Sequence, residues 1–292
     1  MIIIGCSHGK HLSKSIAKRL RAAHSELFVN KFPDDELLVR FQSSVKNKDI
    51  VLVQSFYGNI SDCMIETILA AKTARELGAK KIKLVAPYFP YLRQDKRFHP
   101  GESESQGIIA GLFDKYFDAI YIIDPHLHRK SSLRQIFRIK SVKISANSLI
   151  ADYIKKRIKN PVLIGPDSES YKWAQNVAHN INADFRILEK TRYSSYHVEV
   201  KLNRKIDLRK KNIVIVDDIV STGHTIIETA KLLRKLGAKK VYCICVHGIF
   251  AGSGLKKLRK NRINVISTNT IPNEVARIDV SGLVGSYLKI RK

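Results

Sequence analysis

Short runs of apolar residues recur along the chain and alternate with stretches whose apolar positions have helical spacing. The runs are rich in β-branched residues and are continuous rather than alternating, as expected for strands buried on both faces. The strands expected from them are residues 1–4, 50–54, 82–86, 119–123, 162–164, 213–216 and 241–246. Strands of this kind separated by helices predict an α/β architecture, with mainly parallel sheets flanked by helices.

One pattern occurs in both halves of the chain. Residues 65–67 read Ile-Glu-Thr and residues 77–81 read Leu-Gly-Ala-Lys-Lys; the same letters return at 227–229 and 236–240. Each copy follows an apolar strand, and each glycine stands where the C′ residue of a helix belongs. Chance recurrence in a lysine-rich chain is the alternative. A repeat near half the chain length favours a duplicated domain, so we expect domains at 1–143 and 144–292, with a helix at 146–159 opening the second.

Charge and cysteine content limit the function classes. Lys and Arg total 52 against 26 acidic residues, a formal charge of +26 over 292 residues. Such a charge favours encounters with polyanions, and alone it leaves a solvated basic surface and nucleic-acid binding equally open. There is no CxxC pair, no secretory leader and no apolar stretch near the ~18 residues of a membrane span. We therefore expect a cytoplasmic protein that does not associate with membranes.

The sharpest chemical motif follows the strand at 213–216. Two carboxylates, Asp217 and Asp218, precede a turn of small residues, Ser221-Thr222-Gly223, and a helix then begins. Ligands of open α/β sheets bind beyond the C-terminal strand ends, and free N–H groups at a helix N-terminus attract phosphate. We interpret this motif as a site for a phosphorylated sugar. The alternative is a helix capped by Ser221 or Thr222, with solvated acids.

Two motifs in the first half suggest nucleotide binding. Arg93, Gln94 and Asp95 follow the strand at 82–86 and an aromatic, proline-containing stretch. Aromatic rings can stack on a base and arginine can pair with phosphate, although a hydrophobic loop with a basic rim is the alternative. The second motif, residues 32–36, reads Phe-Pro-Asp-Asp-Glu. By itself it is an acidic turn, for which plain solvation is the more common role.

Metal-ligand and cationic side chains also follow strands. His126 comes just after the strand at 119–123, and Asp167 after the strand at 162–164. Mg²⁺ takes few protein ligands and keeps water and substrate phosphates.

Lys190 and Arg192 face the same way if extended, and two cations can neutralise a transferring phosphoryl group. A lone His or a Lys-x-Arg pair is more commonly structural or solvated. Cys243, Cys245 and His247 alternate on one strand, where core packing outweighs metal binding.

These motifs, taken together and in their order along the chain, resemble those of the ribose-phosphate pyrophosphokinase family, and the resemblance runs from Met1 nearly to Lys292. It implies two tandem phosphoribosyltransferase-like domains, with ATP-binding elements in the first and a ribose 5-phosphate loop in the second. The implied ATP-binding residues are Phe32, Asp34, Glu36, Arg93, Gln94 and Asp95. The implied ribose 5-phosphate-binding residues are Arg192, Asp217, Asp218, Ser221, Thr222, Gly223, His224 and Thr225.

The resemblance also implies a reaction. Pyrophosphate passes from ATP to the 1-hydroxyl of ribose 5-phosphate and AMP leaves, with Lys190 and Arg192 catalytic and Mg²⁺ held by His126 and Asp167. Members of the family form homo-oligomers. Asp35, His224 and residues 168–170 stand where the family commonly has glycines. A catalytically weak or inactive homologue associated with a true synthetase is therefore the main alternative.

Two further alternatives have less support. A nucleic-acid-binding regulator would account for the charge of +26, but the sequence has no recognition motif. A phosphoribosyltransferase acting on a base would share the fold. The two-domain length and the Arg93-Gln94 motif count against it.

Overall fold

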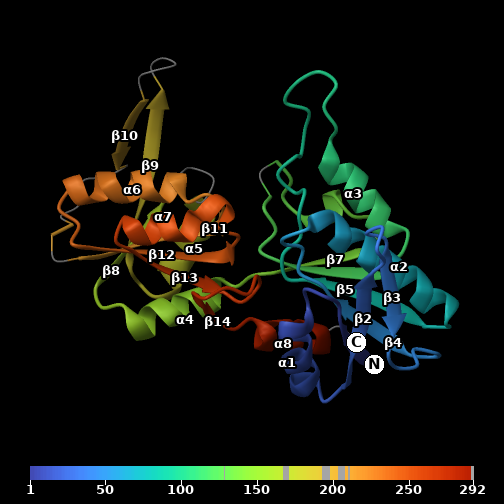
Figure 1. The fold of residues 1–292 in the computed structure, drawn as a ribbon. Helices are drawn as coiled ribbons and strands as arrows, with labels where there is room; N and C mark the ends of the chain where they lie inside the picture. The colour runs from blue at the N-terminus through green and yellow to red at the C-terminus, as the bar shows by residue number, and fades with distance from the viewer. Residues whose placement is uncertain (128, 167–170, 193–197, 203–207, 210, 291–292) are drawn as a thin grey trace. The chain divides into compact units, whose positions relative to one another are not determined.

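The computed structural model describes the chain except for residues 128, 167–170, 193–197, 203–207, 210 and 291–292, and at 171–172, 188–192, 198–202 and 290 it describes the backbone alone. The chain forms two compact units (Figure 1). One comprises Met1–Ser145 and the segment from Val280 onward, and the other comprises Ala146–Asp279. Each is an α/β unit, as the sequence predicts.

The first unit contains a seven-stranded sheet of order β3-β2-β1-β4-β5-β6-β7. All neighbouring pairs are parallel except β2 and β3, which form an antiparallel hairpin at one edge. The strands are β1 (Ile2–Gly5), β2 (Ala23–Lys31), β3 (Leu37–Phe41), β4 (Asp49–Val53), β5 (Lys81–Ala86), β6 (Ala119–Ile123) and β7 (Lys140–Ile144). The helical elements are α1 (Lys10–Leu20), α2 (Ile60–Glu76), α3 (Ser105–Asp114), η1 (Leu133–Gln135) and α8 (Ser281–Ile290).

The second unit repeats this arrangement with a seven-stranded sheet of order β10-β9-β8-β11-β12-β13-β14. The strands are β8 (Pro161–Gly165), β9 (Asp184–Arg192), β10 (Val198–Leu202), β11 (Asn212–Val220), β12 (Lys240–Gly248), β13 (Ile263–Thr268) and β14 (Ala276–Ile278). The helical elements are α4 (Asn147–Arg157), α5 (Tyr171–Asn180), α6 (His224–Lys235), η2 (Ala251–Ser253) and α7 (Gly254–Lys260). Position by position, β1 to β7 correspond to β8 to β14, and the edge hairpin β9–β10 corresponds to β2–β3 (Figure 1).

The apolar runs of the sequence form the centres of both sheets. Ile3, Ile4 and Val51 in the first unit, and Val214 and Ile215 in the second, have no measurable exposure. Burial on both faces explains why these strands read as continuous apolar runs. Each of the seven strands expected from sequence is present, and the helix expected at 146–159 is α4. None of the described helices is long and apolar enough to cross a membrane.

Seven further strands were not predicted from the sequence, because in those whose burial is described, half-buried or exposed positions interrupt the apolar run. They are β2, β3, β7, β9, β10, β13 and β14. In β3, for example, half-buried and exposed residues alternate. Edge strands and hairpins need no continuous apolar run because one face or one edge stays in solvent. The strand expected at 213–216 is also longer than expected: β11 continues through Asp217 and Asp218 to Val220.

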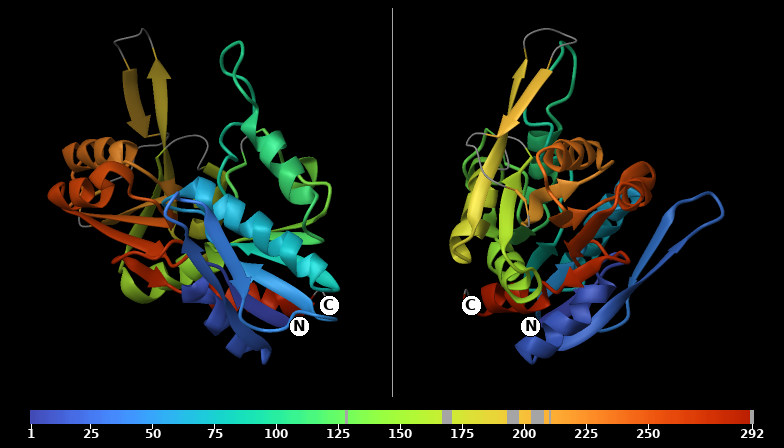
Figure 2. Two further views of the ribbon diagram at one scale, coloured as in Figure 1. Left: turned by 45° about the vertical axis from the view of Figure 1, so that its right-hand side comes forward. Right: turned by 90° about the vertical axis from the view of Figure 1, so that its left-hand side faces the viewer.

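Helix α8 changes the division expected from sequence. We expected the second domain to run from 144 to the C-terminus, but the segment from Val280 onward belongs to the first compact unit. There α8 lies beside α1 (Figures 1 and 2), and Arg19 Nε of α1 donates a hydrogen bond to Ser281 Oγ at 3.2 Å. Val284 and Leu288 are buried. Burial of this apolar face overrides the sequence continuity of α8 with the second unit.

Truncation of Leu288 tests the placement of α8. We expect Leu288→Ala to lower the free energy of unfolding by about 2–5 kcal/mol, because it leaves a cavity in a buried site. Hydrogen exchange should accelerate in β1 and α1 and stay unchanged in α4 and β14. Lys289→Ala, which alters an exposed neighbour, should change stability by less than about 0.5 kcal/mol. Faster exchange confined to the second unit would contradict the assignment.

Candidate functional site

Two carboxylates lie near the end of β11, before the loop that leads into α6. Asp217 and Asp218 are half-buried at the C-terminal end of β11, and Asp218 N donates to Asp217 Oδ1 at 3.0 Å. Asp217 pairs in register with Cys245 of β12. Burial raises the pKa of the Cys243 thiol, and the Asp217 carboxylate raises it further. The two cysteines are thus protonated core residues, and no group of three or more His, Cys, Asp and Glu forms a metal site in the described parts of the chain.

Helix α6 begins without a side-chain cap in the part of the chain that the structure describes. Its N-cap is Gly223, whose φ of 76° lies in the left-handed region that favours glycine, and no described side chain accepts a hydrogen bond from the first turn. Neither Ser221 nor Thr222 therefore plays the capping role that was the alternative explanation of this motif. The first helical bond runs from Ile227 N to Gly223 O at 3.0 Å. The earlier N–H groups of the helix remain available for an anion.

His224 stands at the first position of α6. It is exposed and is not among the non-glycine residues with positive φ. The turn's left-handed residue is Gly223 instead. An imidazole is therefore accommodated at 224 without backbone strain, although the resembled family commonly has glycine there.

The corresponding loop of the first unit provides an internal comparison. There β4 leads into α2, and the Asn59 side chain caps the helix by accepting from Asp62 N at 3.3 Å. Gln54 follows β4 where Asp217 follows the apolar run of β11; it accepts from His8 N and donates to Glu66, at 2.9 and 3.2 Å. In the first unit, polar side chains of the protein thus make the hydrogen bonds at the helix start and at the strand end for which the second unit has no described side-chain partner. The start of α2 is therefore capped by a side chain, whereas the start of α6 has no described side-chain cap.

A segment that sequence analysis did not single out supports the open loop. Ile249 N and Phe250 N both donate to Val220 O, at 3.0 and 3.1 Å. At Gly254, the first residue of α7, an added Cβ would lie 2.6 Å from Ser221 O. The backbone of this segment therefore packs directly against the loop. Its glycine-rich sequence, Gly248-Ile249-Phe250-Ala251-Gly252-Ser253-Gly254, was the available signal.

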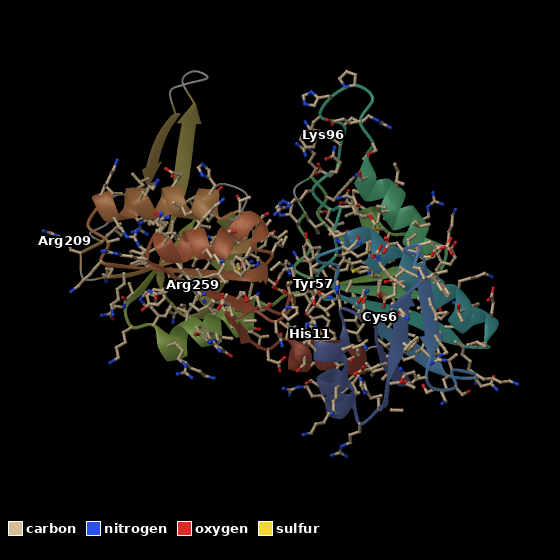
Figure 3. All side chains as sticks on the ribbon, viewed as in Figure 1. Cys6, His11, Tyr57, Lys96, Arg209 and Arg259 are labelled. Atoms are coloured by element: carbon tan, nitrogen blue, oxygen red, sulfur yellow. The ribbon has the colours of Figure 1, made fainter. Side chains whose placement is uncertain are left out.

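The first unit brings two other motifs together at one sheet edge. Because β5 and β6 are parallel neighbours, the segments that follow them, with Arg93–Asp95 and with Asp124 and His126, leave the same edge. Asp124 is buried and has a φ of 33°, unusual for a residue other than glycine. Backbone strain of this kind concentrates at functional sites. Gln94 Nε2 donates to Glu102 Oε2 at 3.3 Å within the β5–α3 connection, which carries Lys96 (Figure 3).

The motif at 32–36 lies at the tip of the β2–β3 hairpin. Phe32 N donates to Glu36 O at 2.9 Å, and the Phe32 side chain is 49% exposed. Asp35 has a φ of 69°, so it takes the conformation that the family's usual glycine would take. β1 and β4 separate β2 from β5 in the sheet, a distance of about 14 Å at the usual strand spacing. The structure does not bring Phe32, Asp34 and Glu36 together with Arg93–Asp95.

Some predicted site residues fall where little is described. Asp167 lies outside the described residues. Lys190 and Arg192 lie on β9, where the backbone alone is described and pairs with Val200 and Val198 of β10.

A cavity of about 520 Å³ is lined by residues 134–141, on η1 and β7 of the first unit. It includes the cations Arg134, Arg138 and Lys140. None of the residues predicted from sequence lines it.

Comparisons with known proteins cover nearly the whole chain. Residues 1–116 match the N-terminal domain of ribose phosphate pyrophosphokinase, and residues 132–281 match the phosphoribosyl transferase domain. The ribose-phosphate pyrophosphokinase of Pyrococcus abyssi is 34% identical over 280 residues, covering 96% of this chain and 95% of that protein. That of Saccharolobus solfataricus is 34% identical over 287 residues, covering 96% and 98%. The crystal structure of phosphoribosylpyrophosphate synthetase from Mycobacterium smegmatis superposes with a TM-score of 0.86 at 25% identity, covering 99% of this chain and 97% of that one.

Substitution of Gly254 tests the support beneath the loop. We expect Gly254→Ala to lower the free energy of unfolding by about 1–3 kcal/mol, because its methyl group would overlap the Ser221 carbonyl. Hydrogen exchange at 221–226 should accelerate. Gly111→Ala is the matched control: a Cβ there meets nothing within 4 Å, and in a helix the change should stabilise by about 0.5–1 kcal/mol. Equal behaviour of the two variants would contradict the close packing.

Proposed function

Because the chain belongs to the ribose-phosphate pyrophosphokinase family, we propose that it transfers pyrophosphate from ATP to the 1-hydroxyl of ribose 5-phosphate and releases AMP. The observation that supports this most directly is the uncapped start of α6 behind Asp217 and Asp218. Phosphate-binding N–H groups and sugar-binding carboxylates there adjoin one another in a single loop. A phosphorylated pentose matches that combination.

The second unit binds the acceptor in this proposal. The N–H groups of the turn 221–225 and the positive end of α6 hold the 5-phosphate. Asp217 and Asp218 accept hydrogen bonds from the ribose hydroxyls. Arg192, on β9, adds a cation to the bound sugar phosphate.

The first unit binds the donor. Arg93 and Gln94 follow β5 and meet the phosphates and ribose of ATP, and Asp95 adjoins them in the same segment with a side chain that is buried. The exposed ring of Phe32 is free to stack on adenine, with Asp34 and Glu36 beside it in the sequence. Within one chain, the tip of the β2–β3 hairpin lies apart from the C-terminal end of β5, because β1 and β4 stand between β2 and β5. We therefore propose a homo-oligomer in which the hairpin of one copy completes the ATP site of another.

Mg²⁺ is the cofactor of the proposed reaction. His126 is half-buried after β6, and no described cluster of three or more ligand side chains surrounds it. Few protein ligands suit an ion that is held largely by water and substrate phosphates. His126 and Asp167 would hold it, and when bound it would neutralise charge on the phosphates of ATP.

The chain's own residues supply positioning and charge. A bond forms between the sugar's 1-oxygen and the β-phosphorus, and the bond from that phosphorus to the oxygen bridging the α-phosphate breaks. AMP leaves with that oxygen, and the hydroxyl proton passes to solvent. Lys190 and Arg192 stabilise the charge on the transferring group. Reactions of this type depend mostly on orientation and electrostatics.

Two of the three departures from the family pattern, Asp35 and His224, lie in the described residues and are compatible with activity. Asp35 adopts a left-handed φ of 69°, which aspartate tolerates better than most residues. His224 begins α6 in the helical region and is exposed. The third departure, at residues 168–170, lies outside the described residues. At the two described positions the backbone takes a conformation that the residue present can adopt.

Lys190→Ala tests the catalytic assignment. We expect turnover to fall by about 10²–10³-fold, because a cation that stabilises the transferring group is lost. The measurement is AMP release with ATP, Mg²⁺ and ribose 5-phosphate, together with circular dichroism to show an intact fold. Lys239→Ala, at an exposed site after α6, serves as the control. Near-normal turnover of Lys190→Ala would refute the role.

Asp217→Asn tests the sugar site separately from the nucleotide site. We expect the KM for ribose 5-phosphate to rise about 10–100-fold, since the amide places a donor NH2 where the second carboxylate oxygen accepts, and it removes the negative charge. The KM for ATP should stay within about twofold, because Asp217 contributes to transition-state binding through the sugar alone. Equal increases in both KM values would show that Asp217 supports the protein generally.

A further inference from the structure

Arg129 is a residue that neither the sequence motifs nor the proposed reaction includes. It follows β6, three positions after His126, and its Nη1 donates to Asp95 Oδ1 at 2.7 Å. The two partners differ in environment: the Asp95 side chain is 2% exposed and that of Arg129 is 50% exposed. Asp95 Oδ2 is buried and has no hydrogen-bond partner among the described residues. Arg129 is therefore the counter-charge of a buried carboxylate.

Other hydrogen bonds around Asp95 stay within the β5–α3 connection and the start of α3. Gln106 N donates to Gln94 O at 3.2 Å, and Gln106 Nε2 donates to Leu92 O at 3.1 Å. Glu102 Oε2 accepts from Gln94 Nε2 and from Phe98 N, at 3.3 and 2.8 Å. These bonds shape the connection that carries Arg93 and Gln94. They do not fix its position relative to β6.

The Arg129–Asp95 pair links the β5–α3 connection to the segment that follows β6. Arg129 belongs to the connection after β6, which also carries Asp124 and His126, whereas Asp95 belongs to the connection after β5. The Arg129 guanidinium also lies 5.9 Å from the ring centroid of Phe98 in the β5–α3 connection. A cation over an aromatic face adds a second attraction between the same two connections.

We propose that Arg129 is a positioning residue for the donor site: by neutralising and holding Asp95, it sets the Arg93–Gln94 segment against the His126 segment. The proposal rests on the proposed function, which assigns ATP to the first segment and the metal ion to the second. Arg129 acts through Asp95 and does not touch the nucleotide. An unpaired buried carboxylate would draw Asp95 toward solvent and would move Gln94 with it.

The first experiment compares Arg129→Ala, Arg129→Lys and the control Arg134→Ala, which removes an exposed arginine from the same connection. We expect Arg129→Ala to raise the KM for ATP about tenfold, the usual size of an effect on an outer contact of a binding group. The KM for ribose 5-phosphate and kcat should change less than about twofold, because the acceptor site and the transferring cations are untouched. Arg129→Lys keeps the positive charge, so its KM for ATP should lie between those of the wild-type protein and Arg129→Ala.

A double-mutant cycle separates positioning from direct contact. If Arg129 acts through Asp95, Asp95→Asn and the double variant Asp95→Asn, Arg129→Ala should have the same KM for ATP. A further increase in the double variant would mean that Arg129 contacts the nucleotide, which overturns the proposal. A wild-type KM for ATP in Arg129→Ala would overturn it as well. If Arg129→Ala fails to fold, the double variant, which carries no buried unpaired charge, and Arg129→Lys still provide the comparison.

Binding of a non-hydrolysable ATP analogue with Mg²⁺, measured by titration calorimetry, distinguishes this inference from the proposed function. A wild-type protein that releases no AMP would refute the proposed function. Weaker analogue binding by Arg129→Ala than by Arg134→Ala would still support the positioning role. Equal binding by these two variants would refute that role, whether or not the wild-type protein is active.

Discussion

The N–H groups at the start of α6, which have no side-chain partner among the described residues, are the constraint on which the proposed function depends. A helix N-terminus that no side chain caps needs another partner for its N–H groups, and anions are the partners that its dipole favours. Gly223 makes this geometry possible through its left-handed φ. The segment that leads into α7 then holds the loop open by bonding Val220 O and by bringing the Gly254 backbone against Ser221. The phosphate cradle that we propose is therefore formed by the backbone.

The duplicated sheets make this constraint more informative. Both units have the same strand order, and in both a helix follows the central strand. In the first unit Asn59 caps that helix, and Gln54 is engaged with Glu66. The same fold thus carries this loop twice, once with a side chain that caps the following helix and once without a described cap. The difference lies in a few side chains and not in the architecture, as expected when function resides in sites added to a shared fold.

The sequence predicted the centres of both sheets because strands buried on both faces must be continuously apolar. It did not predict the edge strands, whose exposed positions interrupt the pattern, or the return of α8 to the first unit, which depends on tertiary packing against α1. The β11 motif was interpretable because small residues and acids in one turn have few structural uses. Arg129 gave no signal at all: in a chain with 52 Lys and Arg residues, one more cation looks like solvated surface until its buried partner is known.

The large positive charge has a physical consequence for an enzyme of this kind. ATP and ribose 5-phosphate are both anions, so a formal charge of +26 raises their encounter rates and makes those rates sensitive to salt. Exposed cations such as Arg209 point outward over the surface (Figure 3) and are screened at physiological ionic strength. At 2.7 Å from a carboxylate that is 2% exposed, the guanidinium of Arg129 is screened much less. General attraction and specific positioning are therefore separable by salt: added salt should weaken the first and leave the Arg129–Asp95 link largely intact.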